Sequence, residues 1–264
     1  MPRFAANLSM LFNEHEFLAR FEAAARAGFK GVEFMFPYPF KPEDVAEQIR
    51  SNGLELALFN LPPGNWEAGE RGIACLPDRR EEFRDAVAKG IEYARVLGAP
   101  KLNCLAGIPG AGVDHETARR TLIDNLRYAG PLLAAQNIVL VVEAINIYDI
   151  PGFFLNRSGE TIALLDEVGV PNIKLQYDIY HMQRMEGEIA ATLKRLLPRI
   201  GHVQIADNPG RNEPGTGEIN FPFLFRYLDA IGYDGWVGCE YRPANGTEAG
   251  LGWLPPVEPE FEPG

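Results

Sequence analysis

Eight short apolar segments alternate with helix-like segments along the whole chain. These apolar segments begin at Arg3, Gly31, Leu54, Lys101, Ile138, Ile173, His202 and Trp236. Several are almost continuously apolar, as is typical of parallel strands that helices cover on one side and that pack inside on the other. Eight strands alternating with helices predict a single α/β domain, a (β/α)₈ barrel. A doubly wound open sheet is the alternative, but it usually needs fewer strands, and no G-x-G-x-x-G turn follows the first segment.

The segments between the strands carry signals for the ends of helices. Asn13 and Glu16 form a candidate capping box before an apolar face, and Gly28 is expected to close that helix. Pro42 and Gly53 are expected to bracket the second helix in the same way. Further apolar helix faces are expected near residues 83–94, 122–129, 162–165, 189–197 and 224–231.

Three later positions give further signals for helix ends. Pro131 is expected to kink or end the fourth helix, because proline cannot donate the helical hydrogen bond. Asn220 is expected to cap the seventh helix. Only a short final helix is expected, within TEAGLGWL at residues 247–254. We therefore predict a barrel domain over residues 1–254 and a flexible, Pro- and Glu-rich tail over residues 255–264.

Composition narrows the classes of partner. The chain has 264 residues with 25 basic and 36 acidic side chains, so its formal charge is −11. Such a charge repels nucleic acids and anionic membranes, and neither is expected as a partner. No apolar run suits a signal peptide or a membrane span, so we expect a cytoplasmic protein. Cys75, Cys104 and Cys239 show no C-x-x-C spacing and are expected to be small core residues.

Four of the apolar segments end in polar residues that suit one divalent metal. VVEAIN contains Glu143, LQYDIYH contains Asp178, HVQIAD contains Gln204, and WVGCEY contains Glu240. They lie about one β/α unit apart, so a barrel would bring all four to the rim formed by the carboxyl ends of its strands. Any one of them could instead cap a helix or pair with an arginine, but the set favours a site. All-oxygen ligands favour Mg²⁺, with Mn²⁺ as the alternative.

Other candidate site residues lie beside these strand ends or in the loops that follow. His181, three residues after Asp178, is expected at the site mouth as a substrate hydrogen-bond donor or proton partner. Arg211, in the turn-rich segment after the seventh strand, could bind a substrate carboxylate or hydroxyl, with Glu213 and Glu218 to orient it. Three lid candidates follow the third strand: Trp66, Glu70 and Arg71. The remaining histidines are expected to be structural or solvated: His202, His15 and His115.

Longer motifs resemble a known family. They are FAANLSMLF at Phe4, GVEFMFPY at Gly31, NLPPGNWEAGERGIAC at Asn60, LQYDIYHMQRMEGE at Leu175, GHVQIADNPGRNEPGTGEIN at Gly201 and GWVGCEYRP at Gly235. Together these motifs are specific to one family, and they span nearly the whole chain. The chain resembles the hydroxypyruvate isomerases, within the xylose isomerase-like TIM-barrel superfamily.

The resemblance implies a fold, an activity and a set of site residues. Members interconvert hydroxypyruvate and tartronate semialdehyde (2-hydroxy-3-oxopropanoate), or act on the related 2-oxo-tetronates. The family's metal positions fall on Glu143, Asp178, Gln204 and Glu240, and its acid/base pair falls on Glu143 and Glu240. Related ketose 3-epimerases typically carry a histidine where this chain has Gln204, which favours the isomerase branch.

The leading hypothesis is therefore a metal-assisted isomerase of a small hydroxy-oxo acid that works through an enediolate. A 2-oxo-tetronate isomerase and a ketose 3-epimerase are the nearest alternatives. A metal-dependent endonuclease that cleaves DNA at abasic sites is a further alternative. The acidic net charge and the presence of only four histidines argue against it. A non-catalytic barrel protein is disfavoured by the intact ligand set. Substrate chain length and association into a homo-oligomer stay open at this point.

Overall fold

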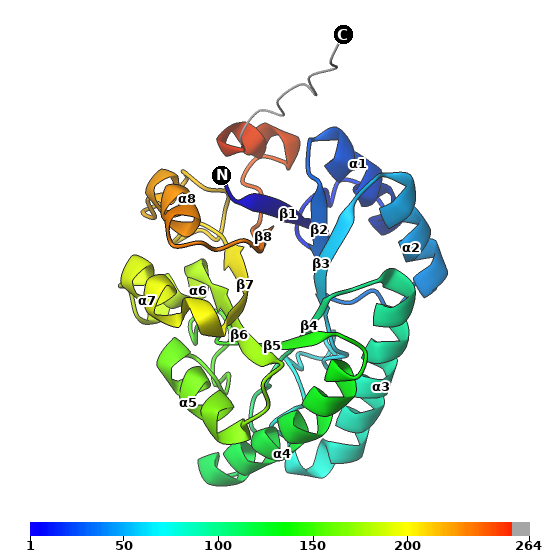
Figure 1. Ribbon diagram of the computed structural model, residues 1–264, viewed down its shortest axis with the longest axis vertical. Helices are drawn as coiled ribbons and strands as arrows, with labels where there is room; N and C mark the ends of the chain where they lie inside the picture. The colour runs from blue at the N-terminus through cyan, green and yellow to red at the C-terminus, as the bar shows by residue number, and fades with distance from the viewer. Residues whose placement is uncertain (255–264) are drawn as a thin grey trace.

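The computed structural model describes residues 1–254 and contains a closed barrel of eight parallel strands (Figure 1). The strands pair in chain order, and the first closes on the last. Their bounds are β1 Arg3–Asn7, β2 Gly31–Phe34, β3 Glu55–Asn60, β4 Lys101–Cys104, β5 Val139–Glu143, β6 Ile173–Asp178, β7 Ile200–Ile205 and β8 Trp236–Cys239. The prediction of a (β/α)₈ barrel rather than an open sheet is confirmed.

Helices cover the outside of the barrel (Figure 1). The α-helices are α1 Arg20–Arg26, α2 Pro42–Ser51, α3 Arg80–Leu97, α4 His115–Ala134, α5 Ser158–Val168, α6 Ile179–Met185, α7 Ile189–Leu196 and α8 Phe221–Ala230. Short 3₁₀ helices lie at η1 Phe17–Ala19, η2 Pro77–Arg79, η3 Leu197–Arg199 and η4 Glu248–Trp253. Each predicted helix face coincides with one of these helices, and buried apolar residues from helices and strands join in one core.

Several predicted helix ends are confirmed. Pro42 occupies the first turn of α2, and Gly53 follows its end with a left-handed φ of +60°. The Asn220 side chain caps α8 by accepting a hydrogen bond from the Phe223 N–H at 3.1 Å. These helix ends could be predicted from the local sequence because their backbone conformations suit proline, glycine and asparagine.

Two predicted helix ends are wrong. The Asn13 and Glu16 side chains do not cap α1: a 3₁₀ turn precedes that helix, and the Asn13 amide instead donates to the Met10 carbonyl at 2.9 Å. Pro131 does not end α4, since the helix continues to Ala134, and a kink at Pro131 stays a prediction. Pro131 is exposed, whereas Leu133 is fully buried, so packing of the last turn outweighs the missing backbone donor.

The chain after β6 and after β8 also differs from a simple repeat. The sequence patterns did not predict α6, which begins directly after Asp178. After β8 the described residues contain only the 3₁₀ helix η4, in agreement with the weak final helix expected there. The predicted tail at 255–264 lies outside the described residues, and the barrel boundary at 254 stays a prediction.

The register of the barrel lines up polar residues near the carboxyl ends of the strands. The paired residues are Asn7 with Glu33, Glu143 with Gln176, and Asp178 with Gln204. The three cysteines are buried and free, as predicted. No helix within residues 1–254 is long and apolar enough to cross a membrane.

Candidate metal and substrate site

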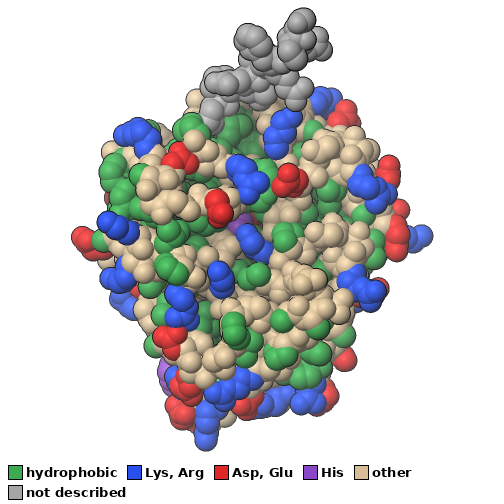
Figure 2. Space-filling model, in the orientation of Figure 1, with side chains coloured by type: hydrophobic (Ala, Val, Ile, Leu, Met, Phe, Trp, Pro, Cys, Tyr) green, Lys and Arg blue, Asp and Glu red, His purple; other side chains and the backbone are tan. Residues whose placement is uncertain are grey.

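A cavity of about 990 Å³ opens over the carboxyl ends of the strands. The loops after most of the strands contribute to its wall, as expected of a barrel of this kind. Figure 2 shows charged side chains of both signs around a hollow in the middle of this view. The cavity wall includes six of the predicted site residues: Glu143, His181, Glu240, Arg211, Trp66 and Arg71.

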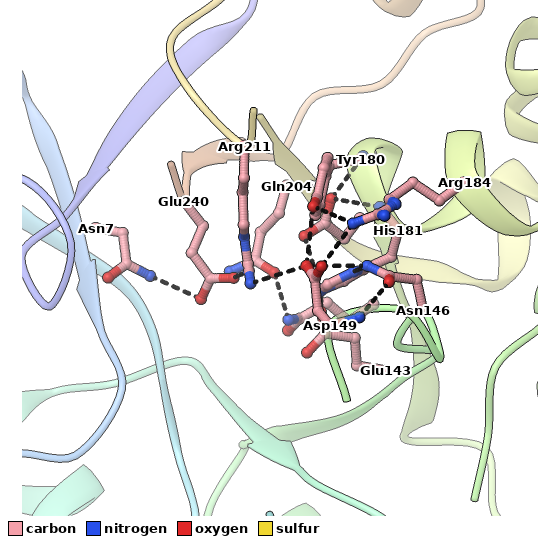
Figure 3. A network of polar contacts seen from close by, with 12 residues as sticks. Asn7, Glu143, Asn146, Asp149, Tyr180, His181, Arg184, Gln204, Arg211 and Glu240 are labelled. Carbon is pink, nitrogen blue, oxygen red and sulfur yellow. Dashed lines mark hydrogen bonds and ion pairs between the residues drawn. The ribbon is translucent and has the colours of Figure 1, made fainter. Parts of the chain in front are cut away.

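Three carboxylates and one imidazole converge at the floor of the cavity. Glu143 and Asp178 are the last residues of β5 and β6, and Glu240 directly follows β8. One atom from each of these carboxylates and from His181 lies within 4.8 Å of the others, and all four side chains are buried. Neighbouring strand ends therefore bring together residues that are far apart in the sequence (Figure 3).

Two oxygens of this cluster have no hydrogen-bond partner in the part of the chain that the structure describes. Glu143 Oε1 and Asp178 Oδ2 accept no hydrogen bond from residues 1–254. The nearest donor, His181 Nε2, lies 3.6 Å from each of them, which is beyond a good hydrogen bond. Leaving a buried polar atom unsatisfied costs about 1–3 kcal/mol. A divalent cation would satisfy both oxygens, so the residues present fit the predicted metal.

Gln204 lies beside this cluster with its amide orientation fixed. Its Nε2 donates to Glu33 Oε1 at 2.7 Å, and its Oε1 accepts from Gln176 Nε2 at 2.6 Å. Because a carboxylate can only accept, Glu33 determines which end of the amide is nitrogen. The Gln204 oxygen keeps a second lone pair, and its chemistry suits the all-oxygen ligand set. Its role as a ligand stays a prediction.

Glu33 is a buried residue at the centre of this network that the sequence reading did not single out. Its carboxylate accepts from Asn7 Nδ2 at 3.0 Å and contacts His202 Nε2 at 2.7 Å. A Cβ on Gly238 would stand 2.2 Å from Glu33 Oε2, so the glycine leaves room for this carboxylate. A glutamate inside the apolar segment GVEFMF was the available signal, the same one that pointed to Glu143.

His202 is buried in β7 under the site, and His181 stands at the cavity wall. This agrees with the structural role expected for His202 and the site position expected for His181. His181 Nδ1 lies 2.7 Å from the Asn146 amide nitrogen. Burial, assisted by the nearby charge of Arg211, lowers the pKa of His181 well below its usual range. His181 is therefore neutral near pH 7.

Burial also shifts the carboxyl groups of the cluster. It raises the pKa of Glu143 well above the usual range, and the negative charges of Glu240 and Asp178 add to the rise. Burial likewise raises the pKa of Asp178 and Glu240, against the opposing charge of Arg211. Three carboxyls in one buried space thus destabilise one another's anions, and a bound cation would reverse this.

Arg211 reaches the cluster from the loop after β7. Its Nη2 donates to Glu240 Oε2 at 2.6 Å, and its Nη1 lies 3.9 Å from Asp149 Oδ2 (Figure 3). Its backbone has a left-handed φ of +55°, an uncommon conformation for a residue other than glycine. Arg211 lines the cavity, and its role in substrate binding stays a prediction. The proposed orienting residues act elsewhere: Glu213 accepts from the Ala244 N–H, and Glu218 accepts from the Asn208 amide.

The loop after β3 places two of its three candidates in the cavity wall. Trp66 and Arg71 line the cavity, and the Arg71 guanidinium lies 4.1 Å from the centre of the Trp66 ring. The Arg71 Nη1 donates to the backbone carbonyls of Trp66 and Glu70. Glu70 is not among the residues that line the cavity. Its carboxylate pairs with Arg79 and accepts from the Asn65 N–H, which fixes the shape of the loop.

The cavity wall also contains polar residues that the sequence reading missed. Asp149 accepts a hydrogen bond from the Tyr180 hydroxyl at 2.9 Å and pairs with Arg184. Arg184 lies 4.9 Å from the ring centre of the exposed Tyr148. Asp149 and Arg184 do not follow an apolar segment directly, so no strand-end signal marked them. They come together only because the loop after β5 folds against α6.

Comparison with known proteins identifies the family. The family model for xylose isomerase-like TIM barrels matches residues 21–257. Hydroxypyruvate isomerase of Escherichia coli is 57% identical, with 97% of this chain and 99% of that protein covered. 2-Oxo-tetronate isomerase of Cupriavidus necator is 51% identical, with 97% and 98% covered.

One solved structure has almost the same fold. A Brucella melitensis protein described as AP endonuclease, family 2, is 45% identical and superposes with a TM-score of 0.95, with 98% of this chain and 100% of that chain covered. The resemblance inferred from the sequence motifs is confirmed. The chain belongs to the xylose isomerase-like TIM-barrel family, and within it to the group that contains the hydroxypyruvate and 2-oxo-tetronate isomerases.

Proposed function

We propose that this chain interconverts hydroxypyruvate and tartronate semialdehyde. The observation that carries the proposal is the pair of buried glutamates, Glu143 and Glu240, that face one charged cavity from β5 and from the end of β8. The names of the relatives at 57% and 51% identity support the same reaction class. Two carboxylates that reach a small acid from different strands can serve a reversible proton transfer between adjacent carbons.

Glu143, Asp178, Gln204 and Glu240 would hold a divalent cation, Mg²⁺ first and Mn²⁺ second. The unpartnered oxygens of Glu143 and Asp178 support this assignment. When bound, the cation supplies charge that polarises the substrate carbonyl and favours negative charge on the substrate oxygens. His181, neutral and 3.6 Å from two of these carboxylates, is suited to hydrogen-bond a substrate oxygen in the same space.

The two glutamates divide the proton transfer between them. One removes a proton from C3, the hydroxyl-bearing carbon of hydroxypyruvate, and leaves an enediolate. A carboxylic acid then returns a proton to C2, while the hydroxyl proton on O3 passes to O2, so that the product is the isomeric aldehyde. With the cation bound, its charge would keep both glutamates ionised, so that either can accept a proton from carbon.

Arg71 is the best candidate to bind the substrate carboxylate. Arg211 and Arg184 also line the cavity, but their charges are already matched by Glu240 and Asp149. Within residues 1–254 the Arg71 guanidinium hydrogen-bonds only backbone carbonyls. It is half-buried against Trp66, so its remaining donors can hold an anion at low cost.

The test is proton exchange observed by NMR in D₂O with Mg²⁺-loaded protein. Hydroxypyruvate, a four-carbon 2-oxo-tetronate and a neutral ketose are incubated in parallel, with EDTA as the control. We expect deuterium at the carbon next to the carbonyl and the appearance of tartronate semialdehyde, both lost with EDTA. Absence of turnover with every substrate, despite bound metal, would contradict the proposed function.

A 2-oxo-tetronate is the alternative substrate that a specific observation favours. The cavity of about 990 Å³ lies at the upper end of ligand cavities, which are commonly about 300–1,000 Å³. It therefore leaves room for a fourth carbon and its hydroxyl. Exchange confined to the four-carbon acid would keep the mechanism and change the substrate, whereas exchange confined to the ketose would favour an epimerase.

A further inference from the structure

Asn146 is a fully buried amide that no prediction singled out. It follows Glu143 by three residues, in the loop after β5. Its side-chain oxygen accepts hydrogen bonds from two backbone groups of the same loop, the Tyr148 N–H at 3.1 Å and the Asp149 N–H at 2.9 Å. Both are obligate donors, so they determine which end of the amide is oxygen.

The opposite end of this amide is therefore its NH₂ group, and it faces His181. Asn146 Nδ2 lies 2.7 Å from His181 Nδ1 and 3.2 Å from Asp149 Oδ2 (Figure 3). An NH₂ group has protons to give and no lone pair to offer, so His181 Nδ1 must be the acceptor. A neutral imidazole that accepts at Nδ1 carries its proton on Nε2.

The protonated Nε2 points into the carboxylate cluster. It lies 3.6 Å from Glu143 Oε1 and 3.6 Å from Asp178 Oδ2, the two oxygens without a partner among residues 1–254. A nitrogen that carries a proton has no lone pair for a metal. It can only donate, and a substrate oxygen seated between the nitrogen and the carboxylates would receive that hydrogen bond.

We infer that Asn146 is a positioning residue that fixes His181 as the Nε2–H tautomer. His181 then serves as a hydrogen-bond donor to the substrate and stays outside the ligand set of the cation. The four convergent residues of the cluster include His181, yet this tautomer leaves Gln204 as the fourth ligand. The donor role rests on the proposed function, whereas the tautomer depends only on the contacts of Asn146.

The decisive measurement is the protonation of the His181 ring nitrogens by long-range ¹H–¹⁵N NMR. Protein labelled at histidine is examined near pH 7, metal-free and with Mg²⁺, and His181→Gln assigns the signal. We expect the proton on Nε2 in both states. A proton on Nδ1 in the wild-type protein, or an Nε2 without a proton after Mg²⁺ binding, would overturn the inference.

The variant Asn146→Asp tests the cause. Aspartate has nearly the same shape, and one of its oxygens can still accept from the Tyr148 and Asp149 N–H groups. Its other oxygen, which replaces the NH₂ group, can only accept. His181 should therefore move its proton to Nδ1 and expose a lone pair on Nε2. The His202 ring signal, from the buried pair with Glu33, is the control for an intact fold. An unchanged His181 tautomer in a folded variant would overturn the role of Asn146.

Kinetics and metal binding then separate positioning from a merely structural effect. In Asn146→Asp, kcat should fall about 10–100-fold, the usual cost of changing a residue that orients a site side chain, while KM changes little. Calorimetry should show Zn²⁺ binding strengthened relative to Mg²⁺, because an imidazole nitrogen joins the oxygens. Unchanged kcat and unchanged metal preference would count against the inference. Wild-type protein inactive on every substrate, but with the Nε2–H tautomer, would refute only the proposed function.

Discussion

At the scale of single residues, this site is a set of buried acidic groups that destabilise one another's charged forms, and the proposed cation would relieve this. The Glu143, Asp178 and Glu240 carboxyls are buried, and burial raises the pKa of each. Within the described residues, Arg211 is the arginine that offsets this directly, through its hydrogen bond to Glu240. Among residues 1–254, Arg71 plays a different part, since its charge faces the cavity without a carboxylate partner. These differences lead to two predictions.

Replacing either glutamate by its amide should stop catalysis and keep the fold. In Glu143→Gln and Glu240→Gln we expect kcat to fall at least about 10²–10⁴-fold, the usual contribution of a general acid or base. The melting temperature of the metal-free protein should not fall, because an uncharged amide relieves repulsion among buried carboxylates. Kinetics and thermal melting check both points, with the exposed Glu248→Gln as the control. Turnover retained in both glutamate variants would refute the acid/base assignment.

Removing the Arg71 charge should weaken substrate binding selectively. In Arg71→Gln we expect KM for the acid substrate to rise about 10–100-fold, which corresponds to the loss of a hydrogen bond to a charged group. kcat should change little. The matched control is Arg242→Gln, because Arg242 lines the same cavity but is exposed. An equal rise in KM in both variants would mean a general charge effect instead of a specific contact.

At the scale of elements, the loop between β7 and α8 is organised around one carboxylate. Asp207 accepts from the backbone N–H groups of Asn208, Gly215 and Gly217 at 2.9 Å and of Ile219 at 3.1 Å. The same loop carries Arg211 in its left-handed conformation. The loop is therefore folded around Asp207, and this holds Arg211 against Glu240.

Removing hydrogen bonds to Asp207 should loosen the loop between β7 and α8 and leave the barrel unchanged. In Asp207→Asn, one acceptor becomes a donor, so at least one backbone N–H loses its partner at a cost of about 1–3 kcal/mol. We expect faster hydrogen exchange across residues 207–219, unchanged exchange in β5 and β6, and a fall in kcat/KM of at least about tenfold. Glu218→Gln, in the same loop, is the control. Exchange that stays slow in Asp207→Asn would contradict this account.

At the scale of the whole molecule, the barrel gathers several buried carboxylates inside it, and the proposed cation would balance their charge. The chain as a whole carries a formal charge of −11, and its buried charged residues include Glu33, Glu143, Asp178 and Glu240. Hydrogen bonds link this group across the barrel, since Asn7 Nδ2 donates to both Glu33 Oε1 and Glu240 Oε1. Metal binding should therefore change the stability of the whole fold.

We expect Mg²⁺ to raise the melting temperature and EDTA to lower it. A ligand that binds only the folded state stabilises it by about 2.7 kcal/mol at a concentration 100 times its Kd. Calorimetry with increasing Mg²⁺ checks this, and Asp178→Asn should reduce the rise by removing a ligand charge. A melting temperature that does not respond to Mg²⁺ or Mn²⁺ in the wild-type protein would argue against the metal site.

The sequence by itself determined the eight strands, most of the helices and the strand ends that carry Glu143, Asp178 and Glu240. It could do so because apolar periodicity and strand-end position are local properties of the chain. It failed locally at Asn13 and Pro131, where packing and a tight turn outweighed the usual preferences.

Only the tertiary structure decided which side chains meet. Glu33 and His202, 169 positions apart, form one buried pair, and Asn7 reaches Glu240 across 233 positions. The contact between Asn146 and His181, which determines the His181 tautomer, likewise joins the loop after β5 to α6. Such contacts depend on how the barrel closes and on the register of each strand with its neighbour, and no local pattern in the sequence encodes either.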